Sequence, residues 1–314
     1  MSTGITAPVL AEHPSLTEYA LTVTDGKRDL EGFAERRLGG LRYFVGGEGP
    51  PLVLLHGLGG MATNWRLVAP ALAAERRVIL PELPGHGGSA PLRGATTLEP
   101  FAEAVLVVLE AERAVPAPWV GHSLGALVAL QAAVVQPEAV TGVVLAAGAG
   151  ISSATRLAEA TVTALGVTKP GRLLGRRAHA VAHSRAGRRL AFGWWGVADT
   201  EGFGPAMAEA FLLGPPQHTD TLTAGRALVA SDPRTDLDRV SCPCLCLWGA
   251  SDNWVPLKDG VEYARRLRAP LRVVPDCGHL LIGERPDACL DAVEEFLDRI
   301  GEVYERPLDA EALG

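Results

Sequence analysis

The stretch Trp119-Val120-Gly121-His122-Ser123-Leu124-Gly125 decides how the rest of the chain is interpreted. It joins a short apolar run to a G-x-S-x-G pattern, and apolar residues at helical spacing follow it directly. We therefore expect a buried strand, a sharp turn that exposes the hydroxyl of Ser123, and a helix that starts at Leu124. Glycine on both sides of the serine would permit the two backbones to approach closely. The alternative is that Ser123 only caps the helix.

Similar apolar runs occur on both sides of this turn, and stretches with helical spacing lie between most of them. Strands that alternate with helices predict an α/β fold with a mostly parallel central sheet and helices on both faces. The expected strands are residues 37–39, 41–45, 52–55, 77–80, 119–120, 142–147, 244–248 and 271–274, and the expected helices are 99–113, 124–135, 257–267 and 287–300.

The alternation of strands and helices stops between about residues 149 and 236. That segment contains helix-like stretches, the paired Trp194 and Trp195, and many turn residues, but no clear strand. It is too long for a simple loop. We therefore expect an inserted helical cap. The expected division is an N-terminal extension (1–32), a core (33–148 and 237–300), the cap (149–236) and a polar tail (301–314).

Composition excludes several classes of partner. The chain of 314 residues is 47% hydrophobic and 21% charged, as is ordinary for a globular protein. Its formal net charge of −7 argues against nucleic acid, because phosphate binding needs a basic surface. We find neither a membrane span of roughly 18 apolar residues nor a secretory signal in residues 1–12. A cytoplasmic location is therefore expected, and the oligomeric state is left open.

The chain has five cysteines, an odd number that does not suggest a disulfide framework. Cys242, Cys244 and Cys246 alternate along one apolar run, so that as a strand they would share a face. A metal site is one interpretation. Buried inert thiols are the favoured one, because the neighbours are leucine, tryptophan and proline. We infer a reducing compartment.

Eight histidines compete for the role of general base to Ser123. His279 is favoured because it follows the last predicted strand, which gives the order serine, acid, histidine that accompanies a nucleophile elbow. His122 is expected to be a packed histidine whose side chain points away from the site. The remaining histidines are expected to be structural (His56 and His86, in glycine-rich turns) or to lack a matching context (His13, His179, His183 and His218).

The acid that orients the histidine should lie on the loop after the penultimate strand. Asp252 lies there, in Gly249-Ala250-Ser251-Asp252. The other position where such an acid occurs, after the strand that ends at Ala147, holds no carboxylate. Asp276 is close in sequence to His279 and is the first alternative. Ser123, Asp252 and His279 are therefore the expected catalytic residues.

Five motifs in this order resemble the α/β-hydrolase superfamily, and specifically its cap-bearing serine hydrolases. The resemblance covers about residues 40–148 and 237–300. It rests on His56-Gly57-Leu58-Gly59-Gly60, Leu83-Pro84-Gly85-His86-Gly87-Gly88-Ser89, the residues 121–125, the residues 249–256 and Gly278-His279.

The resemblance implies an oxyanion hole made by the backbone N–H groups of Leu58 and Leu124. One departure is Glu82, where such families usually have aspartate. That position is structural in the family, so the departure leaves the expected chemistry intact. Haloalkane dehalogenases and epoxide hydrolases of this fold have aspartate at the elbow, so that Ser123 argues against both.

The expected activity is hydrolysis of a carboxylic ester, or of a related lactone or thioester, through an acyl-enzyme on Ser123. A small-molecule acyl substrate is implied, with no metal and no organic cofactor, because nucleotide-binding and zinc-binding motifs are missing from the sequence. Three alternatives stay open: a carbon–carbon bond hydrolase, a perhydrolase, and a receptor-like protein with little turnover. The carbon–carbon hydrolases usually have Met-Gly-Gly after the serine, whereas Leu124-Gly125-Ala126 stands here.

Two features of the expected cap could bind substrate. Phe203, Met207 and Phe211 recur every four residues and would form one helical stripe, which together with Trp194 and Trp195 could line an acyl site. The alternative is that the stripe packs in the cap's own core.

The second feature is a basic segment. Residues 151–190 hold eight basic residues and one acidic residue, which could clamp an anionic substrate. The alternative is a solvated helix face with Leu173, Leu174, Val181 and Leu190 directed inward.

Overall fold

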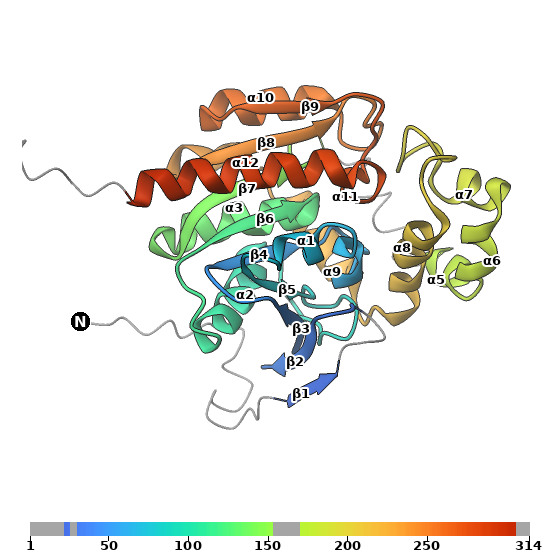
Figure 1. Ribbon diagram of the computed structural model, residues 1–314, viewed down its shortest axis with the longest axis horizontal. Coiled ribbons are helices and arrows are strands. Elements are labelled where there is room, and N and C mark those ends of the chain that lie inside the picture. Colours follow the sequence, from blue (N-terminus) through green and yellow to red (C-terminus); the bar gives the residue numbers. More distant parts are fainter. Residues whose placement is uncertain (1–21, 26–29, 153–169, 306–314) are drawn as a thin grey trace, which may run out of the picture.

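The computed structural model describes residues 22–25, 30–152 and 170–305 (Figure 1). A nine-stranded sheet runs through the molecule in the order β1-β2-β3-β5-β4-β6-β7-β8-β9, with helices on both faces. The strands are β1 (Thr22–Asp25), β2 (Ala34–Leu38), β3 (Leu41–Gly46), β4 (Pro51–Leu55), β5 (Arg77–Pro81), β6 (Ala117–His122), β7 (Val140–Ala146), β8 (Cys244–Gly249) and β9 (Leu271–Val274).

The sheet is parallel from β5 to β9 and antiparallel at its β1–β3 edge. The middle strands are nearly continuous runs of buried apolar residues, as expected for strands covered on both faces. The mostly parallel α/β fold expected from the sequence is therefore confirmed. β1 was not expected, because it lies in the polar segment interpreted as an N-terminal extension. It pairs with β2 through the register Thr22↔Arg37.

The helices of the sheet region have clear roles in packing. α3 packs against β6, β7 and α2, whereas α12 packs against β7, β8 and α1. α12 continues to Glu305, past the expected end of this helix at residue 300. These helices are α1 (Ala69–Leu72), α2 (Glu99–Ala111), α3 (Leu124–Val135), α10 (Leu257–Leu267), α11 (Leu281–Glu284) and α12 (Pro286–Glu305).

No described residue between β7 and β8 lies in a strand. The helices there are α5 (Pro170–Gly175), α6 (Ala178–His183), α7 (Arg185–Phe192), α8 (Pro205–Gln217) and α9 (Thr221–Ala230). Helices α5–α8 lie together at one end of the molecule and have a hydrophobic cluster of their own (Figure 1). α9 differs, because its Ala224, Ala227 and Leu228 belong to the main core under the sheet. We call residues 170–217 the α5–α8 segment; the expected domain boundaries themselves stay predictions.

Candidate active site

Ser123 lies in the turn between β6 and α3. Its backbone has φ 52° and ψ −112°, a strained conformation for a residue with a side chain. Glycine is required on both sides. A Cβ at Gly121 would overlap the backbone of Gly125, and a Cβ at Gly125 would lie 2.6 Å from the carbonyl oxygen of Leu55. The structure therefore has the strand, sharp turn and helix that the G-x-S-x-G pattern predicts.

The imidazole of His279 lies between the side chains of Asp252 and Ser123. Its Nδ1 atom is 2.9 Å from Oδ2 of Asp252, and its Nε2 atom is 3.1 Å from Oγ of Ser123. A carboxylate only accepts, so Nδ1 carries the proton and Nε2 presents its lone pair to the hydroxyl. All three residues are buried. The three residues expected to be catalytic thus lie in one hydrogen-bonded chain.

The Asp252 carboxylate is held in place by its own loop. Its Oδ1 atom accepts hydrogen bonds from the backbone N–H groups of Trp254, at 2.8 Å, and Val255, at 2.7 Å. These bonds leave Oδ2 directed at the histidine. Asp276, the alternative acid, is exposed, and Nδ1 of His279 is bonded to Asp252 instead.

The turn at residues 56–60 packs against the elbow. A Cβ at Gly57 would lie 3.1 Å from Cβ of Ser123, so this backbone approaches the serine closely. Leu124 opens α3, and an N–H group in the first turn of a helix has no partner within the helix. Leu58 is half-buried beside the main core. Donation by Leu58 and Leu124 to an oxyanion stays a prediction.

Two buried histidines hold these loops. His56 accepts from the N–H of Leu83 at 3.0 Å through Nε2 and donates from Nδ1 to the carbonyl of Gly57 at 2.8 Å. His122 donates from Nε2 to the carbonyl of His279 at 2.9 Å. Burial lowers the pKa of both imidazoles to about 3, so both are neutral. His122 therefore supports the backbone of the candidate base.

The profile of the alpha/beta hydrolase family matches residues 52–292. The chain belongs to the alpha/beta hydrolase family. The resemblance inferred from the five motifs is therefore confirmed. A hydrolase from Pseudomonas aeruginosa PA01 has a similar crystal structure, with a TM-score of 0.64 and 26% identity over 89% of this chain and 98% of that one.

Relatives in sequence have diverse names. Pimeloyl-[acyl-carrier protein] methyl ester esterase of Aromatoleum aromaticum is 34% identical, over 79% of this chain and 98% of that protein. The magnesium-chelatase 30 kDa subunit of Rhodobacter capsulatus is 31% identical over 84% and 94%. A dihydrolipoyllysine-residue acetyltransferase component of the acetoin cleaving system of Pseudomonas putida is 47% identical, but only over 36% of this chain and 31% of that protein. Family membership thus leaves the substrate open.

His218 directly follows the α5–α8 segment, accepts from its Arg172 through the backbone carbonyl, and contacts two glycine-rich turns. Its Nδ1 accepts from the N–H of Gly87 at 2.9 Å, and its Nε2 donates to the carbonyl of Gly59 at 2.8 Å. Burial lowers its pKa to about 4, which keeps this neutral form. His218 was not expected to have a role, because it lies outside the expected core. No signal in the sequence alone links it to Gly59.

Glu284 connects the same segment to the loop that carries His279. Its Oε1 accepts from the N–H groups of Ala198 and Asp199, both at 2.8 Å, and its Oε2 accepts from Gly278 at 2.7 Å. The carboxylate is buried. Sequence reasoning missed this residue. The available signal was an acidic residue at the end of the apolar run of residues 280–283.

The expected aromatic stripe packs in the hydrophobic cluster of the α5–α8 segment. Phe203 and Met207 are buried there, and the rings of Phe203 and Phe211 are 6.0 Å apart. Phe211 is half-buried and contacts both this cluster and the main core. A Cβ at Gly283 would lie within 3.1 Å of all three side chains, so the stripe lies against the helix that follows His279. Its role in substrate binding stays a prediction.

The paired tryptophans differ in environment. Trp194 is 72% exposed. Trp195 is half-buried, donates from Nε1 to the carbonyl of Ala191 at 2.8 Å, and lies 5.8 Å from the ring of Trp254. The N–H of Trp254 holds Asp252, so the ring of Trp195 packs against a residue of the loop that carries the candidate acid.

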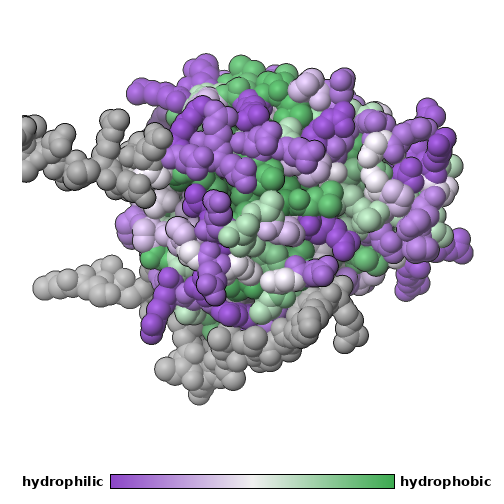
Figure 2. Space-filling view, viewed as in Figure 1, coloured by the Kyte–Doolittle hydropathy of each residue, from purple (hydrophilic) through white to green (hydrophobic). Residues whose placement is uncertain are grey.

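The basic segment has both structural and exposed arginines. Arg172 donates to the carbonyl of His218 at 2.7 Å, and the buried Arg188 donates to the carbonyls of Ala182 and Thr200. Leu174 and Val181 pack against the hydrophobic cluster, as the solvated-face alternative expected. Leu173 and Leu190 are 69% and 82% exposed, so for these two the inward orientation is wrong. Arg176, Arg177, Arg185 and Arg189 are exposed, whereas Arg156 and Lys169 lie outside the described residues. Figure 2 shows hydrophilic residues over this end of the molecule.

The clustered cysteines are thiols in an apolar setting. Cys244 and Cys246 are buried, and burial raises the pKa of Cys246 to about 12. A thiol that stays protonated is a poor metal ligand and a poor nucleophile.

Among the described helices, none has the length and apolar composition needed to cross a membrane.

Proposed function

We propose that this protein is a serine hydrolase that cleaves a carboxylic ester, or a related lactone or thioester, through an acyl-enzyme on Ser123. The observation that carries the proposal is the position of the His279 ring, with Asp252 at 2.9 Å on one side and the Ser123 hydroxyl at 3.1 Å on the other. This arrangement supplies a nucleophile, a base and a group that orients the base.

In the acylation half-reaction, Nε2 of His279 takes the hydroxyl proton while Oγ of Ser123 attacks the substrate carbonyl. The carbonyl oxygen becomes an oxyanion between the N–H groups of Leu58 and Leu124. Collapse of this intermediate breaks the acyl–oxygen bond, and His279 returns the proton to the leaving alcohol. Asp252 stabilises the imidazolium and keeps Nδ1 protonated throughout.

Deacylation repeats these steps with water. Nε2 of His279 removes a proton from the water, the resulting hydroxide attacks the acyl carbon, and the same two N–H groups stabilise the second oxyanion. The proton then passes to Ser123 Oγ as the acid product leaves. Each step uses groups of this chain, so the proposed chemistry needs no metal or organic cofactor.

Two observations support an ester as the substrate: the name of a relative in sequence, and the residues that follow Ser123. A relative that matches over nearly its full length is named a methyl ester esterase. The residues after the serine, Leu124-Gly125-Ala126, differ from the Met-Gly-Gly usual in carbon–carbon bond hydrolases. The receptor-like alternative stays open, because another relative, matched over nearly its full length, is named a subunit of a chelatase and not an esterase.

The deciding experiment combines covalent labelling with a substrate panel. A fluorophosphonate probe followed by peptide mass spectrometry should modify Ser123 at one equivalent per chain. p-Nitrophenyl esters of increasing acyl length should then be hydrolysed with a clear optimum. The matched control is Ser184→Ala, which removes an exposed hydroxyl that caps α7.

Labelling without turnover of any ester, lactone or thioester would favour the receptor-like or carbon–carbon alternatives. Absence of labelling at Ser123 would contradict the proposal itself.

A further inference from the structure

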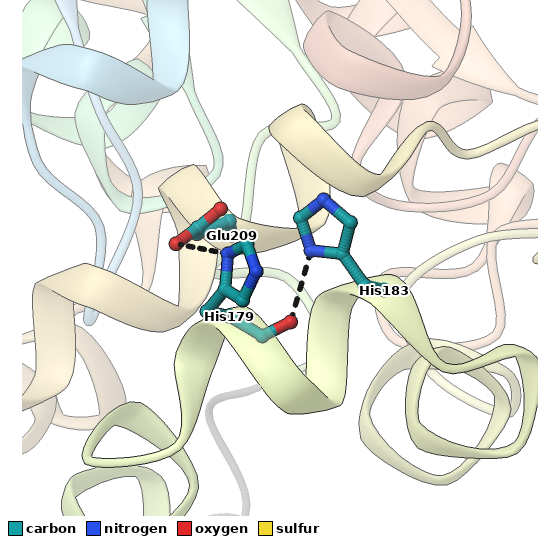
Figure 3. Close-up of side chains that lie close together, drawn as sticks. All are labelled: His179, His183 and Glu209. Atoms are coloured by element: carbon teal, nitrogen blue, oxygen red, sulfur yellow. Dashed lines mark hydrogen bonds and ion pairs between the residues drawn. The ribbon is translucent and has the colours of Figure 1, made fainter.

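A cluster of metal-ligand side chains lies outside the candidate active site. His179 and His183 are four residues apart on α6, so they project from the same face of the helix. Glu209 projects toward them from α8 (Figure 3). One ligand atom from each of the three residues lies within 4.8 Å of the other two. The proposed hydrolysis uses none of these groups.

The geometry points to a binding site here for a divalent transition metal of the zinc type, which cross-links α6 to α8. Two imidazole nitrogens and one carboxylate oxygen form a common zinc ligand set, with water in the remaining position. Calcium and magnesium prefer oxygen ligands, whereas imidazole suits zinc, copper and nickel. The donor set therefore selects the class of metal.

The cluster needs little movement to bind the ion. The ring centroids of His179 and His183 are 4.1 Å apart, and Nδ1 of His179 is 3.5 Å from Oε1 of Glu209. Zinc–nitrogen bonds of about 2.0–2.1 Å would bring tetrahedral ligands to about 3.3 Å from one another. The ligand atoms, now within 4.8 Å of one another, must therefore move closer together. Side-chain rotation permits this, because the side chain of His179 is 76% exposed and His183 is also exposed.

Existing contacts already restrict the ligands. Nδ1 of His183 donates to the backbone carbonyl of His179 at 3.0 Å. This bond holds the His183 ring beside the helical turn that carries His179. Backbone carbonyls of this kind are usual partners of metal-bound histidines. Without a metal, the contact between the exposed His179 and the half-buried Glu209 contributes little to stability. A bound cation would give the two imidazoles and the carboxylate a shared partner.

A metal at this position would add a cross-link between two helices that already pack together. α6 has six residues, too few for a helix that is stable without packing. Ala178 and Ala182 of α6 share a hydrophobic cluster with Met207 and Ala208 of α8. The ion would join the same two helices on their exposed side. It would therefore act on the stability of the α5–α8 segment and take no part in the hydrolysis.

The test is zinc binding to the full chain after treatment with EDTA and removal of the chelator. Isothermal titration at neutral pH should give one Zn²⁺ per chain, and Zn²⁺ should raise the thermal unfolding midpoint. Acidification should release the ion, because histidine must be neutral to bind a metal. His183→Ala and Glu209→Gln should each weaken zinc binding at least tenfold.

Glu201→Gln is the matched control, because it neutralises another exposed carboxylate between α7 and α8. It should bind zinc as the unaltered chain does. All three ligands have exposed or half-buried side chains, so circular dichroism should show folded variants. The absence of saturable binding, or equal binding by the His179→Ala/His183→Ala double variant, would overturn the proposal. The second outcome would move the metal to other groups of the chain.

Discussion

Nε2 of His279 lies 3.1 Å from Oγ of Ser123, although 156 residues separate them in the chain. The sheet explains this proximity. Ser123 follows β6, Asp252 follows β8 and His279 follows β9, and these strands are parallel. The carboxyl ends of parallel strands lie at one edge of a sheet, where α/β proteins place their ligand sites. The topology therefore brings the candidate nucleophile, base and acid to the same edge of the sheet.

Ser123→Ala should abolish ester hydrolysis. The nucleophile is removed, and the remaining rate comes from the oxyanion donors and from substrate binding. The expected loss in kcat is on the order of a million-fold. The thermal unfolding midpoint should change little, because alanine fits the same turn. Retention of more than a tenth of the turnover, with Ser184→Ala as the reference, would show that Ser123 is not the nucleophile.

Asp252→Asn should lower kcat about 10⁴-fold. The amide oxygen can still accept from Trp254 and Val255, but an NH₂ group would then face Nδ1 of His279. The ring would adopt the other tautomer, which places a proton on the nitrogen that should receive one. Steady-state kinetics on the best ester gives kcat directly. Near-normal turnover, with a large loss in Asp276→Asn, would assign the acid to Asp276.

Glu284→Gln should lower kcat about tenfold while KM changes less. One amide oxygen can still accept from Ala198 and Asp199, but the NH₂ group would then face the N–H of Gly278. Loss of a hydrogen bond to a charged group costs about 1.5–3 kcal/mol, and here it would displace the residue that precedes His279. Equal turnover by the variant would limit Glu284 to a role in folding. Glu201→Gln is the control for loss of an acidic charge.

Much of this fold could be predicted because strands inside a parallel sheet have continuous apolar sequences. Residues 52–55 and 244–248 are of this kind, and each matches an observed strand. β1 could not be predicted, because its residues 22–25 are mostly polar. Its pairing comes from the free edge of β2, which is a property of the assembled sheet.

The candidate triad could be predicted because each member lies on a loop directly after a strand, within a recognisable motif. His218 and Glu284 could not. Their partners are backbone groups of distant loops, and a sequence does not show which carbonyl or N–H a buried side chain will meet. Both join the α5–α8 segment to loops beside Ser123 or His279, so this segment is coupled to the site through polar contacts as well as apolar packing.

Phe211→Ala should reduce the hydrolysis of long acyl esters more than that of short ones. Phe203 and Met207 are buried in the cluster of the α5–α8 segment, but Phe211 is half-buried and contacts the main core too. Loss of its ring would remove apolar surface available to an acyl chain. We expect about a tenfold loss in kcat/KM for long chains, within the range for apolar pockets. Equal losses on both substrates, as expected for the core variant Phe203→Ala, would show simple destabilisation.

Acid should destabilise the protein through its buried histidines. Burial lowers the pKa of His218 to about 4 and those of His56 and His122 to about 3, and that of His86 lies well below its ordinary value. In the unfolded chain these groups bind protons near pH 6.5. Below that pH the unfolded state therefore holds more protons, and stability falls as pH decreases. The full contribution is present above about pH 6.5 and is lost progressively, toward pH 4 for His218 and toward pH 3 for His56 and His122.

His218→Gln tests this argument at one position. The carboxamide can donate and accept, as the imidazole does between Gly59 and Gly87, but it does not titrate in this range. The groups that lower the pKa of His218 electrostatically include Arg172, and His86 lies 5.2 Å away, ring to ring. In the variant, the unfolded chain no longer binds an extra proton at position 218. The slope of unfolding free energy against pH should therefore fall by about 1.4 kcal/mol per pH unit. Urea unfolding between pH 4.5 and 6, with the exposed His179→Gln as control, measures that slope. An unchanged slope in the His218 variant would mean that His218 is already protonated in the folded protein, contrary to its bond from the N–H of Gly87.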